Sequence, residues 1–193
     1  EIDSDIVVLF SRATRDFYGQ VAGDYTNDYQ TTCLQLMRQR IGYGVTTGIP
    51  RLGQVRRLVL SSAVCLSRQE REALAAFMAG GGTVIATGPC GFCDERANPV
   101  AKPWLRELGL AVDWDDPPRA GGFPPHRPQR NPPPSAECRV SEKTASNPSG
   151  WFEVTLGKGR LLWRPARMAA KGIAAAAAAQ LQPDARISIV VRG

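Results

Sequence analysis

Three short, continuous runs of apolar residues stand out in the first half of the chain. They occupy residues 6–10, 57–61 and 83–87, and a shorter strand candidate occupies residues 43–47. Apolar runs of this length are typical of strands that are buried on both faces of a parallel sheet. Residues 25–41 carry apolar side chains at helical spacing and stop at Gly42, so the pattern predicts a helix between the first run and the strand candidate.

The segment between the last two apolar runs has a clear helix start and a clear helix end. Ser67 and Glu70 have the spacing of a capping box, in which each side chain bonds the backbone of the other residue. The helix that they open ends at the three glycines 80–82. Strands that alternate with helices of this length imply right-handed crossovers, so an α/β fold with a doubly wound, mainly parallel sheet is predicted.

The alternation of strand and helix signals becomes less regular in the second half of the chain. Residues 103–110 predict a short helix, whereas 115–134 contain eight of the fifteen prolines and predict a long surface loop or insertion. Two strand candidates flank Gly157-Lys158-Gly159 and predict a C-terminal β-hairpin. A helix over 166–181 and a strand over 187–191 complete the chain, which we interpret as one domain spanning residues 1–193.

Composition and charge narrow the classes of function. The 193 residues include 24 Lys and Arg against 18 Asp and Glu, which gives a formal net charge of +6. Twenty of these basic residues are arginines, and they are spread along the chain without forming a run, so we expect no nucleic-acid partner. No stretch approaches the roughly 18 apolar residues of a membrane span, so we expect no membrane partner.

Cysteine and histidine content bears on compartment and chemistry. Five cysteines are an odd number and too few for a small disulfide scaffold, so a reducing, cytoplasmic compartment is the simpler interpretation. His126 is the single histidine, which excludes His-rich metal sites and paired-histidine relays. The chain begins with Glu1, without Met, so we expect a processed chain or a piece of a longer protein.

Several segments together resemble a known domain family. They are SDIVVLFS at 4–11, DYTNDYQTTCLQLMRQRIGYGV at 24–45, VRRLVLSSAVCLSRQEREALAAFMAGGGTVIATGPCG at 55–91 and LGKGRLLWRP at 156–165. The combination resembles the class I glutamine-amidotransferase-like domain, in the form found as the trimerisation domain of family 42 β-galactosidases and related glycoside hydrolases. The likeness covers most of residues 5–95 and, more weakly, residues 150–193, and the proline-rich stretch has no counterpart in it.

This resemblance implies both a fold and a role. The implied fold is a flavodoxin-like three-layer sandwich. The implied role is non-catalytic, with the domain following a TIM barrel that carries the catalytic carboxylates and helping to hold subunits together. Its expected partners are therefore a second copy of the chain or the parent barrel, and carbohydrate would be bound only through the parent enzyme.

Cys90 is the candidate for catalysis. Active members of the amidotransferase superfamily place a nucleophilic cysteine at a strand-to-helix elbow, followed downstream by His and Glu. Cys90 lies about two residues beyond the expected position, and Pro89 removes one backbone donor. His126 lies in the proline-rich stretch, and Arg164 stands near the expected histidine position, so a Cys90-dependent hydrolase or amidotransferase is kept as an alternative to the non-catalytic role.

Metal and cofactor sites have weaker signals. Cys90 and Cys93 form a lone CxxC pair that needs Cys138 and His126 to complete four zinc ligands. The second half of a zinc motif is missing, so we expect no metal. A flavin phosphate would need a glycine-rich loop after the first strand, and the sequence offers only arginines and hydroxyl residues there, so no cofactor is expected.

A third hypothesis is a small-ligand module at the carboxyl ends of the strands. Its candidate binding residues follow the strands 6–10, 57–61 and 83–87, where parallel strands bring their ends to one edge. They are Ser11, Arg12, Ser61, Thr87 and Gly88. Residues 11–15 are interpreted as a solvated loop. The four tryptophans suggest a sugar platform or, more simply, core and interface residues: Trp104, Trp114, Trp151 and Trp163.

Overall fold

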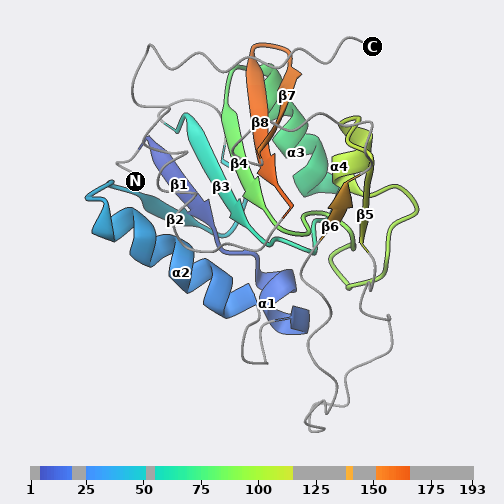
Figure 1. The fold of residues 1–193 in the computed structure, drawn as a ribbon, viewed down its shortest axis with the longest axis horizontal. Helices are drawn as coiled ribbons and strands as arrows, with labels where there is room; N and C mark the ends of the chain where they lie inside the picture. The colour runs from blue at the N-terminus through green and yellow to red at the C-terminus, as the bar shows by residue number, and fades with distance from the viewer. Residues whose placement is uncertain (1–4, 19–24, 51–54, 115–137, 141–150, 166–193) are drawn as a thin grey trace, which may run out of the picture.

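A six-stranded sheet lies at the centre of the molecule in the computed structural model, which describes residues 5–18, 25–50, 55–114, 138–140 and 151–165 (Figure 1). Its strands are β1 (Ile6–Leu9), β2 (Gly44–Thr46), β3 (Arg57–Ser61), β4 (Thr83–Thr87), β7 (Phe152–Leu156) and β8 (Gly159–Arg164). They are arranged in the order β2-β1-β3-β4-β8-β7. All neighbouring pairs are parallel except β7 and β8, which form an antiparallel hairpin.

Helices cover both faces of this sheet, as Figure 1 shows. On one face, Val8, Val59 and Ile85 pack with Leu36 of α2 (Tyr25–Arg38). The other face packs against α3 (Arg68–Ala79) and α4 (Trp104–Glu107). Because both faces are buried, the strands consist of uninterrupted apolar residues rather than alternating ones.

The predicted α/β sandwich with a doubly wound, mainly parallel sheet is confirmed, and so is the C-terminal hairpin. The chain passes from β1 to β2 on one side and then returns to place β3 on the other side. This reversal makes the carboxyl edge between β1 and β3 the topological switch point of the sheet. The narrower flavodoxin-like assignment stays a prediction.

The capping box of α3 is formed as predicted. Ser67 accepts a hydrogen bond from the Glu70 backbone N–H, and the Glu70 carboxylate accepts one from the Ser67 backbone N–H at 2.8 Å. The α2 helix is shorter than predicted and ends at Arg38. Arg40, at φ 57°, terminates it, and the Ile41 N–H bonds back to the Leu36 carbonyl at 2.9 Å.

Two described elements were not expected from the sequence. The interpretation of residues 11–15 as a solvated loop is wrong, because α1 (Arg12–Tyr18) contains all of them except Ser11, which caps the helix. A small antiparallel pair, β5 (Val112–Trp114) with β6 (Cys138–Val140), was also missed. The predicted helix over 166–181, the strand over 187–191 and the proline-rich stretch 115–134 lie outside the described residues.

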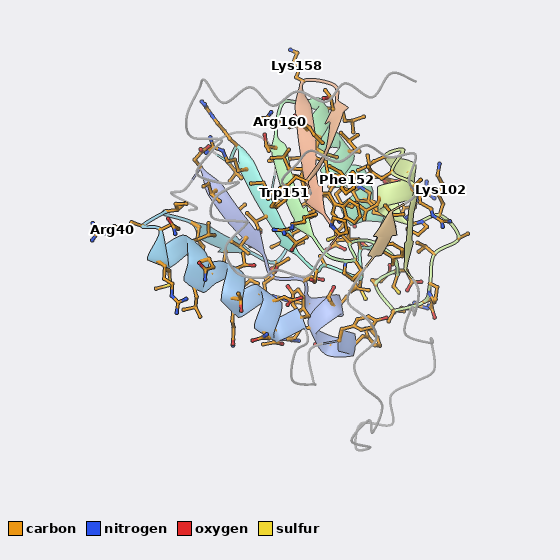
Figure 2. The ribbon with its side chains drawn as sticks, in the orientation of Figure 1. Arg40, Lys102, Trp151, Phe152, Lys158 and Arg160 are labelled. Atoms are coloured by element: carbon orange, nitrogen blue, oxygen red, sulfur yellow. The ribbon has the colours of Figure 1, made fainter. Side chains whose placement is uncertain are left out.

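Close backbone packing joins the hairpin to the end of α3. A Cβ atom on Gly159 would lie 2.2 Å from the Gly82 carbonyl oxygen and 2.3 Å from that of Met78. Gly157, in the hairpin turn, has φ 61°, and a Cβ atom there would lie 2.8 Å from the Ala79 backbone. Figure 2 shows Lys158 at the tip of this turn, with its side chain pointing away from the molecule. The glycine-rich turn predicted from the sequence therefore also sets a helix–hairpin contact.

Candidate functional site

Buried polar side chains gather at the carboxyl edge of the sheet. Those that the described residues contain follow β1, β3 and β4 or lie on the two helices after β1. They are Ser11, Thr14, Asp28, Thr32, Ser61, Ser62 and Thr87. This edge includes the switch point, where ligands of doubly wound folds bind, so we take this polar cluster as the candidate site.

A carboxylate is fixed beside β3 by hydroxyl groups. The Ser62 hydroxyl donates to Asp28 Oδ2 at 2.6 Å, and the Thr32 hydroxyl donates to the Asp28 carbonyl at 2.9 Å. Thr32 Oγ1 also lies 2.8 Å from Ser61 Oγ. Ser62 has φ 50°, a conformation uncommon outside glycine, and its N–H bonds the Thr87 carbonyl at 2.9 Å. The network thus links α2, β3 and β4.

Ser11 caps the N-terminus of α1. Its hydroxyl accepts a hydrogen bond from the Thr14 N–H at 3.2 Å, as an N-cap residue does. Its own N–H donates to the Tyr25 hydroxyl oxygen at 2.6 Å, and that hydroxyl donates to the Leu9 carbonyl at 3.3 Å. Burial raises the pKa of the Tyr25 phenol, which therefore stays neutral. Arg12 lies beside this group but is exposed.

The turn after β4 is held to β8 by backbone hydrogen bonds of Gly88. Gly88 has φ 63°, its N–H donates to the Arg164 carbonyl at 2.9 Å, and its carbonyl accepts from Trp163 Nε1 at 2.9 Å. The Thr87 hydroxyl is different, because it is fully buried and has no hydrogen-bond partner among the described residues. Of the five residues proposed for ligand binding, Thr87 alone has a buried polar side-chain atom that makes no hydrogen bond to the described residues.

The Cys90 thiol is enclosed in the same region. Its side chain is fully buried, and Sγ lies 3.4 Å from the Thr87 carbonyl, to which it donates. Burial raises the pKa of Cys90 to about 12, and the nearby Asp28 adds to this effect. A nucleophilic cysteine needs a lowered pKa and an accessible thiolate. The surroundings of Cys90 therefore favour a packing role.

The CxxC cysteines have separate surroundings. Cys93 forms an isolated parallel bridge with Cys65, and its Sγ lies 3.5 Å from the Tyr18 hydroxyl. In the part of the chain that the structure describes, no three His, Cys, Asp or Glu side chains are placed to hold a metal ion. His126 lies outside the described residues, and only the backbone of Cys138 is described. Among the described residues, the weak candidates Cys90 and Cys93 therefore belong to no cluster of potential metal ligands.

The tryptophans that the structure describes in full are buried. Trp104 and Trp163 are almost completely enclosed, and Trp151 packs on the opposite face of the sheet with Leu162. Figure 2 places Trp151 within the body of the molecule. Buried rings on both faces of the sheet serve the core and offer no sugar platform.

Sequence reasoning found three of the seven buried polar residues and missed the others. Asp28 and Thr32 were not predicted as site residues, because the helix over residues 25–41 is predicted from its apolar positions only. A signal was present, since Asp28, Thr32 and Leu36 recur at every fourth position and so lie on one helix face. Polar residues within the buried stripe of a helix mark a partner network, which here includes Ser62.

None of the helices in the described segments has the length and apolar character needed to cross a lipid bilayer. Comparisons by sequence found no matching family model and no similar curated protein. Comparison of the fold with solved structures gave many matches at low sequence identity.

One similar structure is the β-galactosidase from Bacillus circulans sp. alkalophilus, with a TM-score of 0.67 and 14% identity over 92% of this chain and 30% of that chain. A GH42 β-galactosidase from G. stearothermophilus gives a TM-score of 0.63 and 16% identity over 92% of this chain and 29% of that chain.

The exo-β-1,4-mannosidase from Opitutaceae bacterium strain TAV5 gives a TM-score of 0.53 and 14% identity over 93% of this chain and 34% of that chain. The chain thus spans about a third or less of the length of each of these enzymes. At this level of identity the likeness is one of fold, and the fold is that of a region of GH42 β-galactosidases.

Proposed function

We propose that this chain is a non-catalytic domain of a glycoside hydrolase and that it acts in oligomerisation or interdomain packing. The shared fold with GH42 β-galactosidases supports the enzyme class. The mannosidase match indicates that the fold also accompanies other glycosidases, so the sugar specificity is left open. The enclosed Cys90 thiol supports the absence of amidotransferase chemistry.

The observation that carries this proposal is an apolar surface beside the edge strand. The large apolar side chains that the described residues expose are Leu34 (49%), Met37 (61%) and Val45 (50%), and all three belong to α2 or β2. We call these three residues the α2–β2 surface. Such concentration on one side of a molecule is typical of an interaction site.

Register and contacts place these residues near one another. Val45 pairs with Val8, whose side chain packs on the α2 side of the sheet, so Val45 lies on that same side. Cys33 of α2 hydrogen-bonds Tyr43, which immediately precedes β2. Met37 follows Cys33 by one helical turn, so the apolar flank of α2 faces the β2 side of the sheet.

The outer edge of β2 adds backbone groups that no other described strand pairs. Among the described strands, β2 pairs only with β1. The Thr46 carbonyl accepts from the Phe10 N–H at 2.7 Å, so the backbone groups of Val45 point in the opposite direction. Figure 2 shows the Arg40 side chain extending outward beyond the C-terminal end of α2. Edge groups next to apolar side chains favour pairing with another chain.

Light scattering coupled to size-exclusion chromatography tests the oligomerisation role. We expect the wild-type chain to self-associate and the double variant Leu34→Lys/Met37→Lys to be monomeric at the same concentration. The matched control is Gln69→Lys, which adds a charge to an exposed position of α3 on the other side of the sheet. A wild-type monomer at every concentration, with no association to the parent enzyme's remaining domains, would falsify this function.

A small-ligand module is the second candidate, and the unpartnered Thr87 hydroxyl favours it. Galactose and inorganic phosphate are suitable probes, because one offers hydroxyl groups and the other an anion for the polar edge. Binding at this site should raise the Tm of the wild-type chain and not that of a Thr87→Val variant. An unchanged Tm with both probes at millimolar concentration counts against it.

A further inference from the structure

Two buried thiols face each other across the segments that follow β3 and β4. Cys65 and Cys93 form an isolated parallel bridge, with the Leu66 N–H donating to the Cys93 carbonyl at 3.0 Å and the Cys93 N–H donating to the Val64 carbonyl at 3.1 Å. Residues paired in this way direct their side chains to the same face. Both cysteines are fully buried and carry free thiols.

The backbone geometry suits a covalent link. Paired residues on neighbouring strands have Cα atoms about 4.8 Å apart, and disulfides span Cα separations of roughly 4.4–6.8 Å. The Cα separation typical of such a bridge therefore lies within the range that a disulfide spans. Burial raises the pKa of Cys65, and the neighbouring Cys93 adds to this effect.

Helix α1 covers this pair with two side chains one turn apart. The Thr14 hydroxyl hydrogen-bonds the Cys65 thiol and accepts from the Cys65 N–H at 3.0 Å. The Tyr18 hydroxyl lies 3.5 Å from Cys93 Sγ. The remaining thiols with described side chains are bonded elsewhere, Cys90 to the Thr87 carbonyl and Cys33 to Tyr29 and Tyr43.

We propose that Cys65 and Cys93 form a redox-sensitive internal disulfide that fastens the segment after β4 to the segment after β3. Formation removes one hydrogen atom from each thiol and passes two electrons to a low-molecular-weight disulfide such as oxidised glutathione, which is released as two thiols. One sulfur–sulfur bond forms and one breaks, so the exchange is balanced. Because both thiols are buried and protonated, exchange requires transient opening of the α1 cover.

Refolding of the full-length wild-type chain in a glutathione redox buffer allows exchange to reach equilibrium despite this burial. Non-reducing proteolysis and mass spectrometry should then identify a peptide pair joined through Cys65 and Cys93. The oxidised form should have a Tm about 5–10 °C above that of the reduced form, because the link closes a loop that contains α3 and β4.

Three variants separate this link from general thiol oxidation. Cys65→Ser and Cys93→Ser should each abolish both the linked peptide and the Tm difference. Cys90→Ser is the matched control, a buried thiol from the same CxxC pair, and it should retain both. Refolded native wild-type protein that lacks the Cys65–Cys93 peptide, or that links Cys90 or Cys138 in comparable yield, overturns the proposal without any variant needing to fold.

Discussion

At the scale of single residues, Thr87 has a buried hydroxyl for which the described part of the chain supplies no hydrogen-bond partner. Thr87→Val keeps the shape of the side chain and removes the unsatisfied group, so it should raise the free energy of unfolding by about 1 kcal/mol. Urea denaturation measures this change.

The same substitution at Thr32 is the control for Thr87→Val. Thr32 is equally buried, but its hydroxyl contacts both Asp28 and Ser61. Thr32→Val should therefore lower the free energy of unfolding by about 1–3 kcal/mol. A loss of stability in both variants would mean that the Thr87 hydroxyl has a partner, such as a bound water.

Cys90 makes stability depend on alkaline pH. Burial raises the pKa of its thiol from 9.0 to about 12, so the folded chain holds this proton more tightly than the unfolded chain. The resulting stabilisation is complete below pH 9 and is lost as the pH rises toward 12. At a pH one unit above the unfolded-state pKa the loss is about 1 kcal/mol.

Urea unfolding near pH 8 and pH 10, about one unit on either side of that pKa, measures this dependence. Cys90→Ala should show a smaller fall in stability between the two conditions, by about 1 kcal/mol. Other titrating groups contribute equally to both proteins, so they cancel in the comparison. An identical fall in the variant would show that the thiol titrates normally in the folded chain.

The sequence identified part of the polar cluster because Ser61 and Thr87 end predicted strands and Ser11 directly follows one. Asp28 and Ser62 were not found, since their proximity depends on how α2 crosses the sheet and on the left-handed backbone at Ser62. Neither feature is local in sequence. The pairing of Cys65 with Cys93 was not predicted for the same reason, since it joins two segments that are distant in sequence. The CxxC spacing pairs Cys93 with Cys90 instead.

At the scale of elements, the contact between α3 and the β7–β8 hairpin depends on Gly159. A methyl group there would meet two backbone carbonyls, which cannot rotate away as a side chain can. Gly159→Ala should therefore lower the free energy of unfolding by about 3 kcal/mol. Gly42→Ala is the control, since a Cβ at that position meets nothing within 4 Å and its effect should be below about 0.5 kcal/mol.

Elements differed in how well the sequence predicted them. The bounds of β3 and β4 agree with the apolar runs, because burial on both faces leaves no polar position inside the strand. The α3 start agrees because a capping box is a local hydrogen-bond pattern. By contrast, α1 is only seven residues long and is too short to show a helical pattern of apolar residues. Its start is stabilised by Ser11, which caps the helix and is held by Tyr25 in the folded chain.

At the scale of the whole molecule, the strand order sets a gradient of protection from solvent. Strands β3 and β4 are central and have neighbours on both sides, whereas β2 has one described neighbour. In hydrogen–deuterium exchange we expect the amides of β3 and β4 to exchange slowest and the Val45 amide to exchange fast in the monomer. Protection of Val45 should rise with protein concentration if the α2–β2 surface mediates assembly.

The monomeric Leu34→Lys/Met37→Lys variant provides the reference for that experiment, because it keeps β2 and removes the apolar flank. Slow exchange at Val45 in this variant would mean that another part of the chain covers the edge. Fast exchange in the variant and slow exchange in the concentrated wild type would place the edge strand in the interface.

The close approach of Gly82 and Gly159 has a consequence for comparing this fold with similar structures. Two backbones touch there without side chains between them, so the spacing does not change when neighbouring side chains are replaced. Identity to the β-galactosidase from Bacillus circulans is about one residue in seven, although the fold is shared. A structure-based superposition on that enzyme should therefore show small residues at these two positions, even where the surrounding apolar residues differ.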